Sequence, residues 1–421
     1  MGPILSALGG AAAAAGRAIH FLWSAPSIVG AAFLIAWGAE AAQFMVSQGL
    51  ALAILAWLQT LPEFAVEADI AWNAARGTAG YSDHLVTANF TGSIRLLMGF
   101  GMPMVYFLYA LTRKRGKARP WIALDPFHSV EVISLLPPVL YFFFIVHRGR
   151  LDLLDSIILL AFYAVYLFIL LKMPPEEEEA VEDLPLVARA ILRRGRAGRG
   201  IGVAAVFLAG GLVLWGCVHP FVESMQALAA AVGISGYFFI QWVAPFLSEF
   251  PEKVSAFNWA RFENKAKLGL MNFASSNINQ MTVLVAMIPL VYCASAGEVR
   301  PILFDEEQKS EVLLTAAQAA LCMVLLFNMR FEWWDAAGMF VLFFAQFLSP
   351  AWAGPFGRAL GISCTSHDVR RGLVFVYLGW VALEILLAML GIRTWTFPLR
   401  LGRRPPRRRP PPLDTRRERG P

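Results

Sequence analysis

Apolar stretches of near-constant length recur along this 421-residue chain and restrict its possible folds more than any other feature. A bilayer core about 30 Å thick requires a helix of about 20 apolar residues. Charged residues make up 16% of the chain, against about 25% in soluble domains. The sequence therefore predicts an all-α polytopic membrane protein and excludes a cytosolic enzyme. We expect eleven spans, over residues 26–47, 49–75, 84–111, 129–147, 153–173, 201–225, 235–260, 267–295, 311–329, 334–350 and 372–391.

Positively charged loops predict how the chain is oriented in the membrane. Lys and Arg gather in the segments 113–119, 172–199 and 261–267, and the C-terminal tail alone holds ten Arg. With eleven spans, all of these segments lie on one side, and cytoplasmic loops carry the excess of Lys and Arg. We therefore expect a multi-pass protein of the inner cell membrane with an outside N-terminus and a cytoplasmic C-terminus.

The spans fall into two groups of five around one charged linker. An odd number of spans in each repeat forces the second copy to insert upside down, as in many secondary transporters. The expected organisation is an N-terminal lead-in (1–25), a first five-helix repeat (26–173), a charged cytoplasmic linker (174–200), a second, inverted repeat (201–350), an additional transmembrane helix (351–392) and a basic, Pro/Arg-rich disordered tail (393–421). We interpret the tail as a cytoplasmic anchor and expect the lipid bilayer, with no nucleic acid, as a partner.

A Pro-Glu pair inside an apolar segment is the clearest internal repeat. It occurs once in each half, as Pro62-Glu63 and as Pro251-Glu252. A second polar element follows each pair at nearly the same distance along the chain, and its members are Asn89, Ser93, Asn272 and Ser276. Two elements that repeat in the same order indicate a repeated functional unit.

Carboxylates at bilayer depth are functional candidates because each costs at least about 2.5–3.5 kcal/mol to insert. Each Pro removes a backbone hydrogen bond, which frees the carbonyl groups of Leu58 and Leu247 as oxygen ligands. Helical spacing places further oxygen-bearing side chains on the same faces: Thr60 and Glu67 with Glu63, Ser248 with Glu252, and Gln280 with Asn272 and Ser276. A set of oxygen ligands without His or Cys suits hard cations such as Ca²⁺ and Na⁺.

These paired segments resemble the repeats of the calcium/cation antiporter superfamily, the sodium/calcium exchangers. The resemblance implies a transporter that exchanges Ca²⁺ for Na⁺ by alternating access at mid-membrane carboxylates, without a bound cofactor. It implies that Glu63 and Glu252 hold the metal ion. The expected ion-binding residues are Glu63, Glu252, Thr60, Ser248, Asn89, Ser93, Asn272, Ser276, Asn277 and Gln280, with Glu67, Glu249, Arg95, Leu58 and Leu247 as accessory residues.

Several residues depart from the family pattern. Gln59 and Glu249 stand where the family has small or hydroxyl residues, and Lys253 directly follows the second Pro-Glu pair. A buried charge is expensive unless it is paired. We therefore hypothesise that Arg95 or Lys253 pairs with Glu67 or Glu249, so that a fixed internal cation replaces part of the family's ion array.

Two alternatives to sodium-coupled calcium transport stay open. One is an exchanger coupled to protons, because fewer of the family's Na⁺ ligands are present. The other is a membrane scaffold or sensor that transports nothing. The sequence contains no HExxH, GxSxG, P-loop or dinucleotide-binding motif, so we expect a transporter and not an enzyme.

Overall fold

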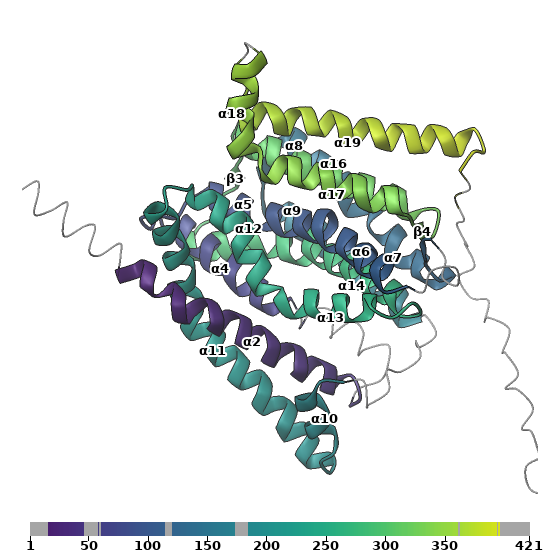
Figure 1. The fold of residues 1–421 in the computed structure, drawn as a ribbon. Helices are drawn as coiled ribbons and strands as arrows, with labels where there is room; N and C mark the ends of the chain where they lie inside the picture. The colour runs from purple at the N-terminus through teal and green to yellow at the C-terminus, as the bar shows by residue number, and fades with distance from the viewer. Residues whose placement is uncertain are drawn as a thin grey trace, which may run out of the picture.

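The computed structural model describes residues 16–45, 58, 60–113, 120–172, 184–360, 363–393 and 395, which are mostly helical (Figure 1). Three short helices of other types, η1 (Leu97–Gly101), η2 (Pro126–His128) and η4 (Gln280–Leu284), interrupt or precede α-helices. The α-helices are α2 (Phe21–Ala42), α4 (Leu61–Ala75), α5 (Asp83–Leu96), α6 (Met102–Thr112), α7 (Ser129–Ser134), α8 (Leu136–Arg148), α9 (Leu153–Lys172), α10 (Leu186–Leu192), α11 (Arg196–Ala231), α12 (Gly236–Ser248), α13 (Phe250–Ala260), α14 (Ala266–Asn279), α15 (Val285–Ala296), α16 (Glu306–Leu326), α17 (Trp333–Phe347), α18 (Ser349–Leu360) and α19 (Ser366–Met389).

The prediction of an all-α membrane protein is confirmed. Each of the eleven predicted ranges overlaps one or more helices. Within the described residues, eight helices are long and apolar enough to cross a membrane, and a ninth is added if α17 and α18, bent by 81°, form one span. The predicted spans 49–75 and 235–260 are not among them. Residues 49–57 lie outside the described part of the chain, and residues 235–260 form two helices, α12 and α13, separated at Glu249.

Both Pro-Glu pairs lie at the start of a helix, which corrects the expectation that they lie in the middle of one. Pro62 is in the first turn of α4, and Pro251 is in the first turn of α13. The first turn of a helix has N–H groups without an intrahelical acceptor, so a residue that lacks this group fits there at little cost. The helix breaks therefore come just before Leu61 and at Glu249, and each Glu of the pairs is in the first turn of the following helix.

Four two-residue strands form two small antiparallel sheets and relate the two halves of the chain. β1 (Ile122–Ala123) pairs with β4 (Arg330–Phe331), and β2 (Arg150–Leu151) pairs with β3 (Ile302–Leu303). The spacing along the chain from β1 to β3 equals that from β2 to β4. Exchanging the halves therefore exchanges the sheets. Since α7 and α8 run from β1 to β2, the sheets lie at opposite ends of these helices, which supports the predicted inverted arrangement.

A π-helical turn occurs at matching places in the two halves. η1 separates α5 from α6, and η4 separates α14 from α15. The spacing between these turns along the chain equals that between Ser93 and Ser276 of the repeated polar element. Because π-helical turns are rare and occur frequently at functional sites, this match identifies α5 and α14 as corresponding helices.

The outer elements of the bundle differ on its two sides. α2 and α11 pack along each other at one side, and α19 packs on α16 at the opposite side (Figure 1). The helices that carry the polar motifs, α4, α5, α12, α13 and α14, lie between them. Of the expected organisation, most of the lead-in, residues 174–183 of the linker and the tail beyond Trp395 lie outside the described residues.

Gly92 lets α5 and α12 approach so closely that a larger residue should separate them. A Cβ atom added at Gly92 would lie 1.8 Å from the backbone oxygen of Gln241. Overpacking costs about 1–3 kcal/mol or more, so Gly92→Ala should lower the thermal unfolding midpoint of the purified protein. Gly216→Ala on α11 is the matched control, since nothing lies within 4 Å of its added Cβ. Equal midpoints for the two variants would contradict this account of the helix contact.

Candidate ion-binding site

Three buried glutamates lie where the chain breaks between helices. Glu63 is in the first turn of α4, Glu252 is in the first turn of α13, and Glu249 is the junction residue between α12 and α13. Their exposed fractions are 0%, 8% and 3%.

Glu63 of the first half contacts Glu249 of the second half. Gln280 Nε2 donates to both carboxyl groups, at 3.1 Å from Glu63 Oε2 and 2.7 Å from Glu249 Oε1. The Ser93 hydroxyl also donates to Glu249 Oε1. The two carboxyl groups interact directly with each other. Residues of α4, α5, the α12–α13 junction and η4 thus meet at one place.

Glu252 lies in a second group of polar side chains beside the first. Asn272 Nδ2 is 3.1 Å from Glu252 Oε1, and the Ser276 hydroxyl donates to the same oxygen. The charged neighbours of Glu252 are Glu249 and Lys253. In the first half, Asn89 Nδ2 donates instead to Glu67 Oε2, at 2.7 Å, and not to the glutamate that corresponds to Glu252.

The two predicted metal-binding glutamates are therefore connected through a third one. Glu249, which the sequence indicated only as an accessory residue, interacts with both Glu63 and Glu252. Among the described residues, no interaction joins Glu63 to Glu252 directly. The junction between α12 and α13 produces this arrangement because it turns Glu249 toward the first half.

Several oxygens of these residues are buried and accept no hydrogen bond. Buried polar atoms are normally partnered, and each unpartnered one costs about 1–3 kcal/mol. A bound cation would supply the missing partner. The oxygens are Glu63 Oε1, Glu67 Oε1, Asn89 Oδ1, Ser248 Oγ, Asn277 Oδ1 and Gln280 Oε1. Both carboxylate and neutral oxygens are among them, as a hard cation requires.

Acidic side chains alone do not complete a metal site. The described part of the chain contains no group of three or more His, Cys, Asp or Glu side chains that could hold a metal ion. Amide and hydroxyl oxygens of the same helices would therefore have to share in coordination. Thr60 is buried at the N-cap of α4, one turn before Glu63.

One of the two backbone oxygens expected as ligands, that of Leu247, has a partner within the protein. The carbonyl of Leu247 lies against the N–H of Glu249, which caps α12. It is therefore part of the helix end. Leu58 precedes the break before α4, and its carbonyl as a ligand stays a prediction.

Two buried cations accompany the glutamates, and one makes the contact that was hypothesised. Lys253 Nζ is 2.5 Å from Glu249 Oε2, and the Lys253 side chain is almost fully buried. Arg95 pairs with a residue outside the motifs: its Nη2 is 2.5 Å from Glu311 Oε2 on α16. The hypothesised pairing of Arg95 with Glu67 or Glu249 is therefore wrong.

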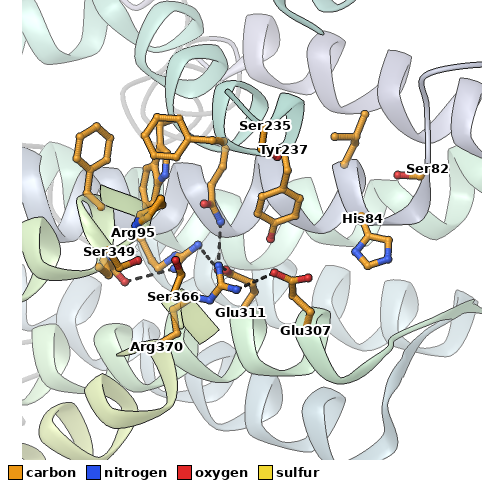
Figure 2. A pocket seen from close by; sticks show the side chains of 17 residues that line it. Ser82, His84, Arg95, Ser235, Tyr237, Glu307, Glu311, Ser349, Ser366 and Arg370 are labelled. Atoms are coloured by element: carbon orange, nitrogen blue, oxygen red, sulfur yellow. Dashed lines mark hydrogen bonds and ion pairs between the residues drawn. The ribbon is translucent and has the colours of Figure 1, made fainter. Parts of the chain in front are cut away.

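The contacts of Glu311 form a buried ion network that the sequence reasoning missed (Figure 2). Arg370 Nη1 on α19 is 2.7 Å from Glu311 Oε1, and Gln241 Nε2 on α12 is 3.1 Å from Glu311 Oε2. Arg370 also pairs with Glu307 at 2.7 Å. The network joins α5, α12, α16 and α19, so it connects the additional helix with a helix of the ion site.

This network borders a pocket of about 390 Å³ (Figure 2). Arg95, Glu311 and Arg370 are among its lining residues, and the carboxyl groups of Glu63 and Glu249 are not. The pocket is therefore separate from the ion site. A periodic signal could have predicted the polar face beneath it: α16 places Gln308, Glu311, Thr315 and Gln318 on one face by i, i+3, i+7 and i+10 spacing, and all four are buried.

Comparisons with known proteins extend over both halves of the chain. A protein-family model described as "sodium/calcium exchanger protein" matches residues 17–172 and 202–349. A solved structure titled "Crystal Structure of H+/Ca2+ Exchanger CAX" is 29% identical, with a TM-score of 0.74 over 90% of this chain and 92% of that chain. The structure of native YfkE is 15% identical, with a TM-score of 0.53 over 77% of this chain and 90% of that chain. No curated protein matches the sequence.

Proposed function

The chain belongs to the sodium/calcium exchanger protein family, and we propose that it exchanges Ca²⁺ for protons at the glutamates around the α12–α13 junction. Members of this family are membrane cation antiporters, so the chain is a multi-pass transporter. Its transported ions are substrates and need no resident cofactor.

The observation that carries the proposal is the contact between the buried carboxyl groups of Glu63 and Glu249. Two carboxylates at such a site repel each other unless a proton or a cation lies between them. Lys253 pairs with Glu249, so the charge of Glu63 is the one left for a proton or a divalent cation, and each of these displaces the other. Gln280 holds both carboxyl groups in place and can present its Oε1, which accepts no hydrogen bond, to a cation.

Protons are the preferred coupling ion for two reasons. The contact between the carboxyl groups leaves a place for a proton without any further ligand. The similar structure at 29% identity is that of a protein titled an H⁺/Ca²⁺ exchanger. Sodium is the second candidate, because the neutral oxygens of Ser248, Asn277 and Gln280 are of the kind that hold Na⁺.

The proposed transport cycle alternates access to this site from the two sides of the membrane. α2 and α11 pack on each other beside the helices that carry the site (Figure 1). We propose that this pair slides along α4 and α13 as one unit, exposing Glu63 first to one side and then to the other. The protein lies in the inner cell membrane. The charges of its loops place the N-terminus outside and the C-terminus in the cytoplasm.

Calcium uptake into sealed proteoliposomes tests the coupling. One set of vesicles is acidic inside, a second holds Na⁺ inside at equal pH, and a third holds choline at equal pH as the control. The proposal expects the pH gradient to drive ⁴⁵Ca²⁺ uptake and the Na⁺ gradient to leave uptake at the control level. Uptake driven only by the Na⁺ gradient would show that the coupling ion is sodium and not the proton. Uptake in none of the vesicles would reject exchange.

A further inference from the structure

The two halves differ in charge at two corresponding positions beside the ion site. The alignment of the halves that places Glu63 on Glu252 also places Thr60 on Glu249 and Phe64 on Lys253. The first half thus carries a hydroxyl and an aromatic ring where the second half carries an anion and a cation. The ion pair of Glu249 and Lys253 therefore has no counterpart in the first half, and it is a feature that the two repeats do not share.

The ammonium group of Lys253 lies at the C-terminal end of α12. Its Nζ is 2.5 Å from Glu249 Oε2 and 3.4 Å from the backbone oxygen of Pro245, a carbonyl in the last turn of α12. The C-terminus of a helix carries a partial negative charge. In transporters built from inverted repeats, half-helix C-terminal ends of this kind, together with unwound backbone carbonyls, coordinate the coupled Na⁺ or H⁺.

Burial makes this position inaccessible to a second cation while Lys253 is present. Lys253 is 1% exposed, and its Nζ lies 5.9 Å from the centre of the Phe246 ring. Both oxygens of Glu249 are engaged, Oε2 by Lys253 and Oε1 by Ser93 and Gln280. Of the carboxyl oxygens of Glu63 and Glu249, the one that accepts no hydrogen bond is thus Glu63 Oε1.

We propose that the Lys253 ammonium is a built-in monovalent cation that occupies the place of a mobile coupling ion such as Na⁺. Lys253 is then a specificity-determining residue: it leaves room for the exchanged divalent cation at Glu63 but excludes Na⁺ from Glu249. This inference rests on the proposed exchange function and names the residue that sets its ion selectivity.

Lys253→Met tests the inference because it removes the ammonium and leaves the Glu249 carboxylate in place. A buried carboxylate without a partner is unfavourable, so Glu249 should recruit Na⁺ from solution. Calorimetry of the full-length protein in detergent measures the Kd for Ca²⁺ in Na⁺ and in choline at equal ionic strength. The wild type should have the same Kd in both salts, whereas Lys253→Met should bind Ca²⁺ about tenfold more weakly in Na⁺.

Three further variants separate the role of the charge from a loss of packing. Lys253→Arg keeps the cation and should show no Na⁺ effect. Glu249→Thr with Lys253→Phe copies the residues of the first half, removes the site for Na⁺ and should also show none. Lys267→Met removes a lysine that pairs with Asp125 away from the ion site and is the control for loss of a lysine in general. Lys253→Gln replaces Lys253→Met if the latter does not fold, with the same expectation.

The outcomes distinguish this inference from the proposed function. If the wild type binds and transports Ca²⁺ but Lys253→Met and Lys253→Gln show no Na⁺ effect, the built-in cation is rejected and exchange stands. A Na⁺ effect of equal size in the Glu249→Thr, Lys253→Phe variant would also reject it, because no carboxylate is left there to hold Na⁺. If the wild type neither binds nor transports Ca²⁺, the proposed function itself fails.

Discussion

Glu63→Gln should reduce the initial rate of Ca²⁺ uptake into proteoliposomes by about 100-fold or more. The amide keeps the size of the side chain but removes a negative charge from a fully buried site. A unit charge about 4 Å from a cation contributes about 4 kcal/mol at an effective dielectric constant of 20, and every 1.4 kcal/mol is about tenfold in affinity. Uptake is measured with equal amounts of inserted protein and an acidic interior.

Glu384→Gln is the matched control for this variant. Glu384 is also buried in a membrane-spanning helix, α19, but it pairs with Arg393 and lies outside the ion site. Its neutral variant should transport Ca²⁺ at a rate close to that of the wild type. A Glu63→Gln protein that is folded and transports as fast as Glu384→Gln would show that Glu63 does not bind the transported ion.

Glu311→Gln should destabilise the protein strongly, by about 3–5 kcal/mol, because breaking a buried ion network leaves buried charges without a partner. Glu311 is fully buried between Arg95 and Arg370, and the amide cannot balance two guanidinium groups (Figure 2). The thermal unfolding midpoint in detergent should therefore fall by several degrees or more. Combining Glu311→Leu with Arg95→Met should recover part of the loss, since fewer charges remain unpaired.

An exposed ion pair of the same helix provides the comparison for Glu311. Glu306 pairs with Lys309 one turn away, and 74% of the Glu306 side chain is exposed. Exposed pairs contribute little to stability, so Glu306→Gln should leave the midpoint nearly unchanged. Equal midpoints for the Glu306 and Glu311 variants would contradict a structural role for the network.

The fold could be predicted from the sequence because the bilayer sets the length of each apolar helix. The eleven predicted ranges overlap helices for this reason. The exact place of the breaks was not predictable from Pro62 and Pro251, since a proline fits both a kink inside a helix and the first turn of a new one. In the structure α12 ends at Ser248, and Glu249 is the residue between α12 and α13.

The candidate site was predicted in composition but not in pairing. The repeated motifs indicated Glu63, Glu252 and their polar neighbours, because carboxylates at bilayer depth are costly. Which of them meet depends on how the two halves interlock. The contact of Glu63 with Glu249 and that of Arg95 with Glu311 each join one half of the chain to the other. Helical periodicity determines which residues share a face, but it does not determine the face of another helix that lies opposite.

The position of the transported cation tests the central claim most directly. An experimental structure of the full-length protein, crystallised with Ca²⁺ or with Sr²⁺, would locate the ion by its anomalous scattering. The account expects the ion at Glu63 Oε1, with ligands from both halves of the chain that include Gln280 or Ser248. An ion bound elsewhere, with the Glu63 carboxyl group in contact only with protein donors, would contradict it.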